Sequence, residues 1–294
     1  MNTQMAKSIQ DPSTVNLVLY HDKCHDGFGA AFAAWKRLGN QATYLGCDHG
    51  SSTFPDVSEK IVVILDFSFK RDILLSMIKS AKQLLVIDHH DSAEKELKEI
   101  PEEYKIFDMT HSGAILAWNF FHPSVMPPNI LLYVEDRDLW NWKWKDAEEI
   151  CAGLDTIPQT FDDWNLIGSD AIRSLKVKGE SILSYRKSVI DSIVSKSTEK
   201  AFEGMICRIV NSPGCGLVSH IGDMMLKKYN VPLAVMWHVD YTTKQVKVSL
   251  RSIPGIDCSV IAKKYKGGGH QRASAFVIPL TMASFGVLSM LFGM

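Results

Sequence analysis

Three apolar runs in the first third of the chain end abruptly in side chains that could hold a metal ion. The residues that follow these runs are His21, Cys24, His25 and Asp26 after run 15–20, Asp66 after run 61–65, and Asp88, His89 and His90 after run 84–87. Carboxylates and imidazoles together are suitable donors for divalent cations. Because ligands of parallel sheets gather at the carboxyl ends of the strands, we expect these side chains to meet at one sheet edge.

Each of these groups also has a plainer interpretation. Asp66 and Asp26 could each cap a helix, and His89 with His90 could lie in a solvated surface loop. With Asp22, there are five ligand-type side chains within the six positions from His21 to Asp26, which is more than helix capping requires. We therefore expect His21 and Asp26 to bind metal, with Cys24 as a softer ligand.

A further charged cluster, Glu135-Asp136-Arg137-Asp138, lies inside an otherwise apolar stretch. Ion pairs on a solvated helix face would be enough to explain it. We favour instead a ligand role for Asp136 at a second metal ion, with Arg137 or Asp138 in support.

The second half of the chain carries a different pattern. Arg251 ends a predicted strand, and Gly267, Gly268 and Gly269 precede His270. Backbone N–H groups of successive glycines can form an anion-binding nest. A guanidinium can donate two parallel hydrogen bonds to phosphate oxygens. An ordinary glycine-rich turn is the alternative when such a segment stands alone.

The elements that must position these residues follow from hydrophobic periodicity. Residues 15–140 alternate strand and helix patterns, which predicts an α/β domain with a largely parallel sheet. We expect strands at 15–20, 43–47, 61–65, 84–88 and 104–107, and helices at 28–38, 70–80, 92–100, 112–121 and from 127 onward. A second α/β unit is predicted from strands 204–211, 232–240, 245–251 and 273–278 with helices 219–229 and 258–265.

These patterns divide the chain into four segments. We expect a flexible arm at 1–14, the main parallel-sheet domain at 15–145, a helical connector at 146–200 and a smaller α/β domain at 201–294. The apolar tail 280–294 is too short to span a membrane, and we expect it to be a docking helix or, as an alternative, a dimer contact.

The composition narrows the class of protein. The 294 residues are enough for two domains with separate cores, and the net charge is −1. A net charge near zero is not typical of proteins that bind long nucleic acid, but it is compatible with a short anionic substrate. Six cysteines without a CxxC pair, and no signal peptide, indicate reduced thiols and a cytoplasmic protein.

Two motifs together give the chain a family resemblance. Val86-Ile87-Asp88-His89-His90, and Arg251 with Gly267-Gly268-Gly269-His270, resemble the DHH phosphoesterase superfamily in its two-domain form with the DHH-associated C-terminal domain. The resemblance spans residues 15–140 and 204–278. It implies a hydrolase that uses two Mn²⁺ ions, with Mg²⁺ or Co²⁺ as alternatives, like the RecJ-like exonucleases, oligoribonucleases, cyclic-dinucleotide phosphodiesterases and exopolyphosphatases of the family.

The resemblance also implies roles for individual residues. The metal ligands it implies are His21, Asp26, Asp66, His89 and Asp136, with Asp66 shared between the two ions. Cys24 stands where the family has a further Asp. The catalytic set becomes Asp66, Asp88, His89 and His90, in which Asp88 supports the cluster and His90 faces the substrate phosphate. The substrate-binding surface that it implies consists of His90, Arg251, Gly267, Gly268, Gly269 and His270.

We therefore expect a manganese-dependent two-metal phosphoesterase that acts on short oligonucleotides or nucleotide phosphates. The chain has no room for a further nucleic-acid-binding module, so we expect neither long duplex nucleic acid nor a membrane as partner. A homodimer is compatible with the sequence. Inorganic polyphosphate is the alternative substrate, and a catalytically inactive nucleotide-binding sensor is the alternative class, which the Cys24 replacement keeps open. A third interpretation is an α/β protein whose charged strand ends are structural.

Overall fold

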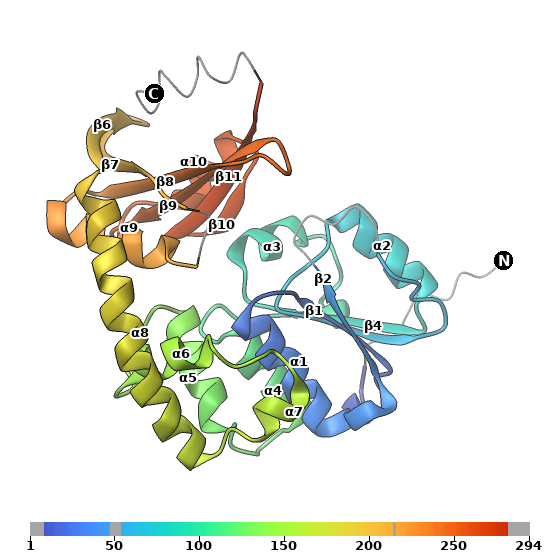
Figure 1. Cartoon of the computed structure of the whole chain (residues 1–294). Coiled ribbons are helices and arrows are strands. Elements are labelled where there is room, and N and C mark those ends of the chain that lie inside the picture. Colours follow the sequence, from blue (N-terminus) through green and yellow to red (C-terminus); the bar gives the residue numbers. More distant parts are fainter. Residues whose placement is uncertain (1–8, 48–53, 214–215, 282–294) are drawn as a thin grey trace. The chain divides into compact units, whose positions relative to one another are not determined.

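The computed structural model describes residues 9–47, 54–213 and 216–281, and the chain divides into two compact units (Figure 1). The first unit is Met1–Leu183 and the second is Ser184–Met294. The boundary falls inside a long helix, α8 (Ser169–Ser195), so the predicted connector is divided between the two units. Most of the predicted tail helix lies outside the described residues. Within the predicted arm, Ile9 is buried in the core of the first unit.

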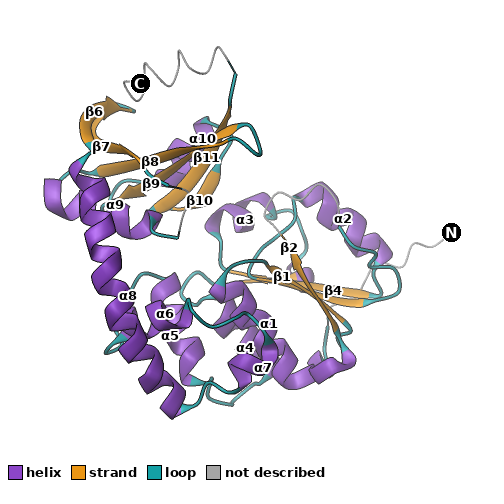
Figure 2. Cartoon of the chain, in the orientation of Figure 1, coloured by secondary structure: helices purple, strands orange, loops and turns teal. Residues whose placement is uncertain are grey.

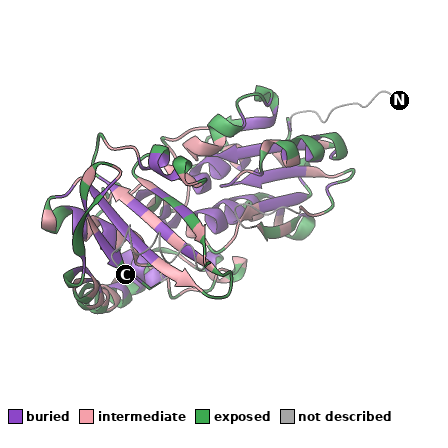
Figure 3. Cartoon of the chain, turned by 90° about the horizontal axis from the view of Figure 1, so that it is seen from above, coloured by how far each residue is buried: buried purple, intermediate pink, exposed green. Residues whose placement is uncertain are grey.

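A five-stranded parallel sheet organises the first unit. Its strand order is β2-β1-β3-β4-β5. The strands are β1 (Leu17–His21), β2 (Thr43–Cys47), β3 (Ile61–Leu65), β4 (Gln83–Asp88) and β5 (Lys105–Phe107). Its central strands are buried (Figure 3). Strands that are covered on both faces consist of continuous apolar residues, which is why apolar and polar residues do not alternate in β3 and β4.

Helices cover both faces of this sheet (Figure 2). One core contains side chains of α1 (His25–Leu38), α4 (Gly113–Phe121) and α5 (Asn129–Asp138) together with Val63 and Ile87. The opposite core contains side chains of α2 (Arg71–Ser80) with Val62 and Val86. Successive strand residues alternate between these two cores, as side chains on a pleated strand must. The short helix α3 (Asp91–Glu96) follows β4. Two further helices, α6 (Ala147–Leu154) and α7 (Phe161–Asn165), precede α8.

The register of the parallel strands brings the ends of three strands together. Tyr20 of β1 is aligned with Leu65 of β3, and Leu65 is aligned with Ile87 of β4. The next residues along the chain are His21, Asp66 and Asp88. These residues therefore lie side by side at the carboxyl edge of the sheet, as expected from the sequence.

The second unit contains a six-stranded sheet with the order β10-β11-β9-β8-β7-β6. Its strands are β6 (Thr198–Phe202), β7 (Met205–Asn211), β8 (Leu233–Asp240), β9 (Gln245–Ser252), β10 (Gly268–His270) and β11 (Ala273–Pro279). The pair β7–β8 is parallel and the other pairs are antiparallel. Side chains of α9 (Val218–Tyr229) and of α10 (Cys258–Lys264) belong to separate cores of this unit.

The fold class is the predicted one: an α/β protein with a parallel-sheet first unit and a smaller mixed α/β second unit. The two edge strands β6 and β10 of the second sheet were not expected from the sequence. Across the described ranges, none of the helices combines the length and the apolar character needed to cross a bilayer.

Candidate metal centre

His89 lies among three carboxylates contributed by distant segments of the first unit. Its Nε2 atom is 3.1 Å from Asp66 Oδ1, 3.5 Å from Asp26 Oδ2 and 3.5 Å from Asp138 Oδ2. The imidazole is only 2% exposed. Ionised groups removed from water in this way are stable only when they are paired or when they bind a metal ion. The arrangement is therefore a candidate ligand shell, which we call the acid–imidazole cluster: His21, Cys24, Asp26, Asp66, Asp88, His89, His90 and Asp138.

Asp66 is the central carboxylate of this cluster. One oxygen faces His89, and the other lies 3.3 Å from Nδ1 of His21. The helix-cap interpretation of Asp66 does not apply, because the residue before α2 is Lys70. Asp66 adopts a left-handed backbone conformation with φ of 61°, which short polar residues tolerate better than others. This conformation turns the chain sharply at the end of β3 and keeps the carboxylate at the sheet edge.

Asp26 reaches the cluster from the start of α1. Its two carboxylate oxygens accept hydrogen bonds from the backbone N–H groups of Gly113, at 2.6 Å, and Ala114, at 2.9 Å. These groups belong to the first turn of α4, where helix N–H groups lack partners inside the helix and attract negative charge. Asp26 therefore caps α4 rather than its own helix, and its Oδ2 atom also faces His89.

Glycines allow the backbone to approach the ligands closely. A Cβ atom at Gly27 would lie 2.2 Å from the carbonyl oxygen of His21, and one at Gly113 would lie 2.5 Å from Cβ of Asp66. Both distances are far shorter than van der Waals contact. Gly113 could not be predicted as part of the site, because its place directly after Ser112, the N-cap of α4, is its only local signal in the sequence.

Substitution of Gly113 by alanine tests this close contact. Alanine normally stabilises a helix relative to glycine, but here the added methyl group would overlap Asp66. We expect Gly113→Ala to lower the free energy of unfolding by about 1–3 kcal/mol, measured by urea denaturation. Gly168→Ala is the matched control, because a Cβ at Gly168 meets nothing within 4 Å. Equal stability of the two variants would contradict the contact.

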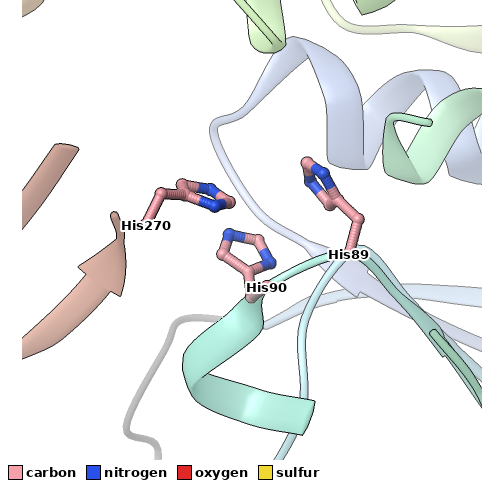
Figure 4. A group of neighbouring side chains, drawn as sticks. All are labelled: His89, His90 and His270. Carbon is pink, nitrogen blue, oxygen red and sulfur yellow. The ribbon is translucent and has the colours of Figure 1, made fainter. Parts of the chain in front are cut away.

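Asp88 holds both histidines of the His89-His90 pair, which Figure 4 shows where β4 passes into α3. Its Oδ1 atom accepts the backbone N–H of His89 at 2.7 Å and lies 2.7 Å from Nδ1 of His90. Its Oδ2 atom accepts the hydroxyl of Ser68 at 2.8 Å. The Asp88 side chain is fully buried. It therefore fixes the orientation of the His90 ring, with Nε2 as the ring nitrogen on the side away from Asp88.

Mutual proximity changes the proton affinities of these groups. Burial raises the pKa of Asp26 well above its usual value, and Asp66 and Asp138 raise it further. Burial also raises the pKa of Asp138, against the opposing effect of His89. Burial would raise the pKa of Asp66 too, but hydrogen bonds from His21 and His89 hold it below its usual value. For His89, burial alone would lower the pKa, but the carboxylates raise it to about 10. The cluster thus retains protons that a divalent cation would displace.

The donor atoms fit the binding of divalent metal. Three groups in the first unit each bring one donor atom per residue within 4.8 Å of one another: His21–Cys24–Asp66, Asp26–His89–Asp138 and Asp66–Asp88–His90. Asp66 belongs to two of the three groups, and carboxylates with imidazoles are the donors that bind first-row divalent ions. Burial, and then Asp66, raise the pKa of the Cys24 thiol, so Cys24 would bind metal only after losing its proton.

Asp136 is not brought into this cluster, which corrects the expectation from the sequence. Its Oδ1 and Oδ2 atoms accept the backbone N–H groups of Lys143 and Trp144, each at 2.9 Å. Asp138, two residues later, is the residue of this segment that faces His89. The neighbouring charges have local partners, because Glu135 contacts His111 and Arg137 contacts Asp155.

In the second unit, Arg251 is held at the end of β9 beside α9. Its Nη2 donates to the hydroxyl of Ser219 at 2.7 Å, and its Nη1 donates to the carbonyl of Leu250 at 2.8 Å. Its side chain packs against Gly222 of α9, where a Cβ atom would approach Arg251 Cγ to 2.6 Å. Burial lowers the pKa of this guanidinium, and an anionic ligand would offset that effect.

Part of the glycine segment, for which we predicted an anion-binding nest or, as the alternative, an ordinary turn, forms a strand. Gly268, Gly269 and His270 form β10, which pairs antiparallel with β11. A Cβ at Gly267 would lie 2.1 Å from the carbonyl oxygen of Ala275. Close packing against β11 therefore accounts for this glycine, and the hydroxyl of Ser274 donates to the carbonyl of His270 at 2.7 Å.

Comparison with known proteins identifies one domain family and one curated relative. The DHHA1 domain family model matches residues 215–284. A curated relative, uncharacterized protein R106 of Acanthamoeba polyphaga mimivirus, is 30% identical over 292 residues, which cover 91% of this chain and 68% of that protein.

Two solved structures share the fold at low sequence identity. RecJ of Thermus thermophilus, crystallised with Mn²⁺, is 13% identical with a TM-score of 0.55, over 94% of this chain and 51% of that chain. The pGpG-specific phosphodiesterase PggH of Vibrio cholerae is 14% identical with a TM-score of 0.51, over 94% of this chain and 97% of that one.

Proposed function

Because this chain belongs to the DHH superfamily of phosphoesterases and carries a DHHA1 domain, we propose that it hydrolyses short oligonucleotides or nucleotide phosphates with two Mn²⁺ ions. The observation that carries the proposal is the meeting of His89 with Asp26, Asp66 and Asp138 at the carboxyl edge of the first sheet. RecJ, which shares the fold, was crystallised with Mn²⁺.

The residues of the cluster have two proposed roles, because some would bind the ions and others would orient the substrate phosphate. His21, Cys24 and Asp66 would hold one ion, and Asp26, His89 and Asp138, which lie beside Asp66, would hold the other. Divalent cations, when bound, lower the pKa of water and supply positive charge to a phosphoryl group. Asp88 fixes the His90 ring, and His90 then presents Nε2 to a phosphate oxygen, where a preorganised donor stabilises developing charge.

The second unit would contribute to substrate binding through Arg251. We expect Arg251→Ala to raise KM about tenfold or more, with a smaller effect on kcat, because a charged hydrogen bond to phosphate contributes about 1.5–3 kcal/mol. Lys247→Ala is the matched control, since Lys247 lies on the same face of β9 and pairs with Asp240. Steady-state kinetics of both variants, with thermal unfolding to confirm the fold, would measure this. A fall in kcat at unchanged KM would contradict the binding role.

The decisive experiment for the function is a substrate screen of the full chain. The protein is first stripped of metal by a chelator and then supplied with Mn²⁺ or Mg²⁺. Dinucleotides, a nucleoside 3′,5′-bisphosphate, cyclic dinucleotides and polyphosphate are tested in parallel for released phosphate or nucleotide. We expect turnover of the short nucleotides that depends on added Mn²⁺. Turnover of polyphosphate alone would show that polyphosphate, and not a short nucleotide, is the substrate. Binding of a nucleotide without any turnover would favour the alternative of an inactive nucleotide-binding sensor.

A further inference from the structure

An unusual turn follows Asp138 directly. Trp140 and Trp142 both adopt left-handed backbone conformations, with φ of 54° and 51°. Bulky side chains rarely occupy this region, because their Cβ atoms approach the backbone too closely. Two indoles in this conformation, separated by one residue, need surrounding structure that holds them there. Strained backbone of this kind is concentrated at binding and catalytic sites.

Asp136 is the residue that holds this turn in place. Its carboxylate accepts the backbone N–H groups of Lys143 and Trp144, and its carbonyl oxygen accepts the backbone N–H of Asn141 at 2.9 Å. The Asp136 side chain is buried. Three hydrogen bonds to one buried residue therefore fix the chain on both sides of Trp142, which accounts for a buried carboxylate that is not part of the metal cluster.

The turn presents an aromatic pair with basic neighbours. The rings of Trp140 and Trp142 lie edge to face, with centroids 5.1 Å apart, and both residues are partly exposed. Lys143 and Lys145, both exposed, follow Trp142 directly and lie on either side of Trp144 in the sequence. Aromatic side chains interleaved with cations bind single-stranded nucleic acid by stacking on its bases and attracting its phosphates.

The same turn adjoins the acid–imidazole cluster within the first unit. Trp140 is two residues after Asp138, whose carboxylate contacts His89, and two residues of chain span at most about 7 Å. We propose that Trp140 and Trp142 form a nucleobase-binding subsite for the nucleoside whose phosphate is held at the cluster. This inference rests on the proposed function and specifies its substrate class, because inorganic polyphosphate has no aromatic face to stack on an indole.

The test compares substrates that differ only in the base. Trp140→Leu and Trp142→Leu remove the aromatic faces but keep an apolar side chain. Trp144→Leu is the matched control, because Trp144 belongs to the same turn but packs against Tyr133 of α5. For each protein, kcat/KM is measured with a dinucleotide of two deoxyadenosines and with the same dinucleotide lacking both bases. Trp140→Phe and Trp142→Phe, which retain an aromatic face, are measured in the same way.

We expect both leucine variants to lose about tenfold or more in kcat/KM on the base-containing dinucleotide, chiefly through KM, and to keep their activity on the abasic one. The phenylalanine variants should retain most of the preference for the base-containing dinucleotide over the abasic one. Equal losses on both substrates, or no loss on either, would overturn the subsite.

A binding measurement separates this inference from the proposed function. Calorimetry with AMP and with ribose 5-phosphate needs no turnover. We expect the unsubstituted protein to bind AMP more tightly than ribose 5-phosphate, and the leucine variants to lose that difference. If no substrate is hydrolysed, the proposed function fails while this difference still supports the subsite. Equal affinity for AMP and ribose 5-phosphate would overturn the subsite even in an active enzyme.

Discussion

Asp66→Asn should reduce kcat by about a thousandfold or more in the presence of saturating Mn²⁺, while leaving the protein folded. The amide has the shape of the carboxylate and tolerates the left-handed backbone that Asp66 adopts. It carries no negative charge, however, and its nitrogen cannot accept a hydrogen bond or bind a cation. Because Asp66 faces both His21 and His89, this one change affects both proposed ion positions.

An exposed aspartate of the same unit provides the control for this variant. Asp72 lies in the first turn of α2, and its side chain is 91% exposed. Asp72→Asn changes the net charge by the same amount and should leave kcat within a factor of two of the original. Turnover by Asp66→Asn within about tenfold of the unsubstituted enzyme, with circular dichroism unchanged, would refute the two-metal mechanism.

Asp138→Asn should weaken metal binding, whereas Asp136→Asn should lower the stability of the fold. Asp138 faces His89, so we expect its amide variant to bind Mn²⁺ at least about tenfold more weakly with little change in unfolding. Asp136 accepts two backbone N–H groups, so its amide variant should lose about 1–3 kcal/mol of unfolding free energy and retain its Mn²⁺ affinity.

Calorimetric titration with Mn²⁺ and urea denaturation distinguish the two roles. The two variants carry the same charge change within three residues of each other, so each serves as the control for the other. If Asp136→Asn weakens Mn²⁺ binding as strongly as Asp138→Asn does, the assignment of Asp138 in place of Asp136 is wrong.

The strand ends could be predicted from the sequence because they follow from two simple regularities. Apolar runs such as 61–65 and 84–87 identify buried strands, and parallel strands place their carboxyl ends at one edge. His21, Asp66 and His89 therefore come together in the structure as expected. Hydrophobic pattern and register determine this part of the site without knowledge of any distant contact.

The contribution of the Glu135–Asp138 segment could not be predicted in the same way. Successive helix residues are rotated by about 100°, so Asp136 and Asp138 point to nearly opposite sides of α5. Both are aspartates, and nothing local indicates which side meets the sheet edge. The choice depends on the packing of α5 and on the turn after it, which supplies two backbone N–H groups to Asp136.

The strands β6 and β10 were missed for a different reason. Gly268 and Gly269 have little intrinsic tendency to form a strand, and β10 exists because it pairs with β11. In β6 the first four residues are exposed, so the sequence lacks the alternation of apolar and polar residues that indicates a half-covered strand. Pairing with a neighbour, rather than the local sequence, determines both edges of this sheet.

The spread of the cluster along the chain ties ion uptake to folding. Its members range from His21 to Asp138 and include a carboxylate anchored on the first turn of α4. No short stretch of nascent or denatured chain assembles such a shell, so the proposed ions would bind tightly only to the native first unit. Binding of the proposed ions would then stabilise the folded state by an amount that grows with ion concentration relative to Kd, and removal of the ions would favour unfolding and proteolysis.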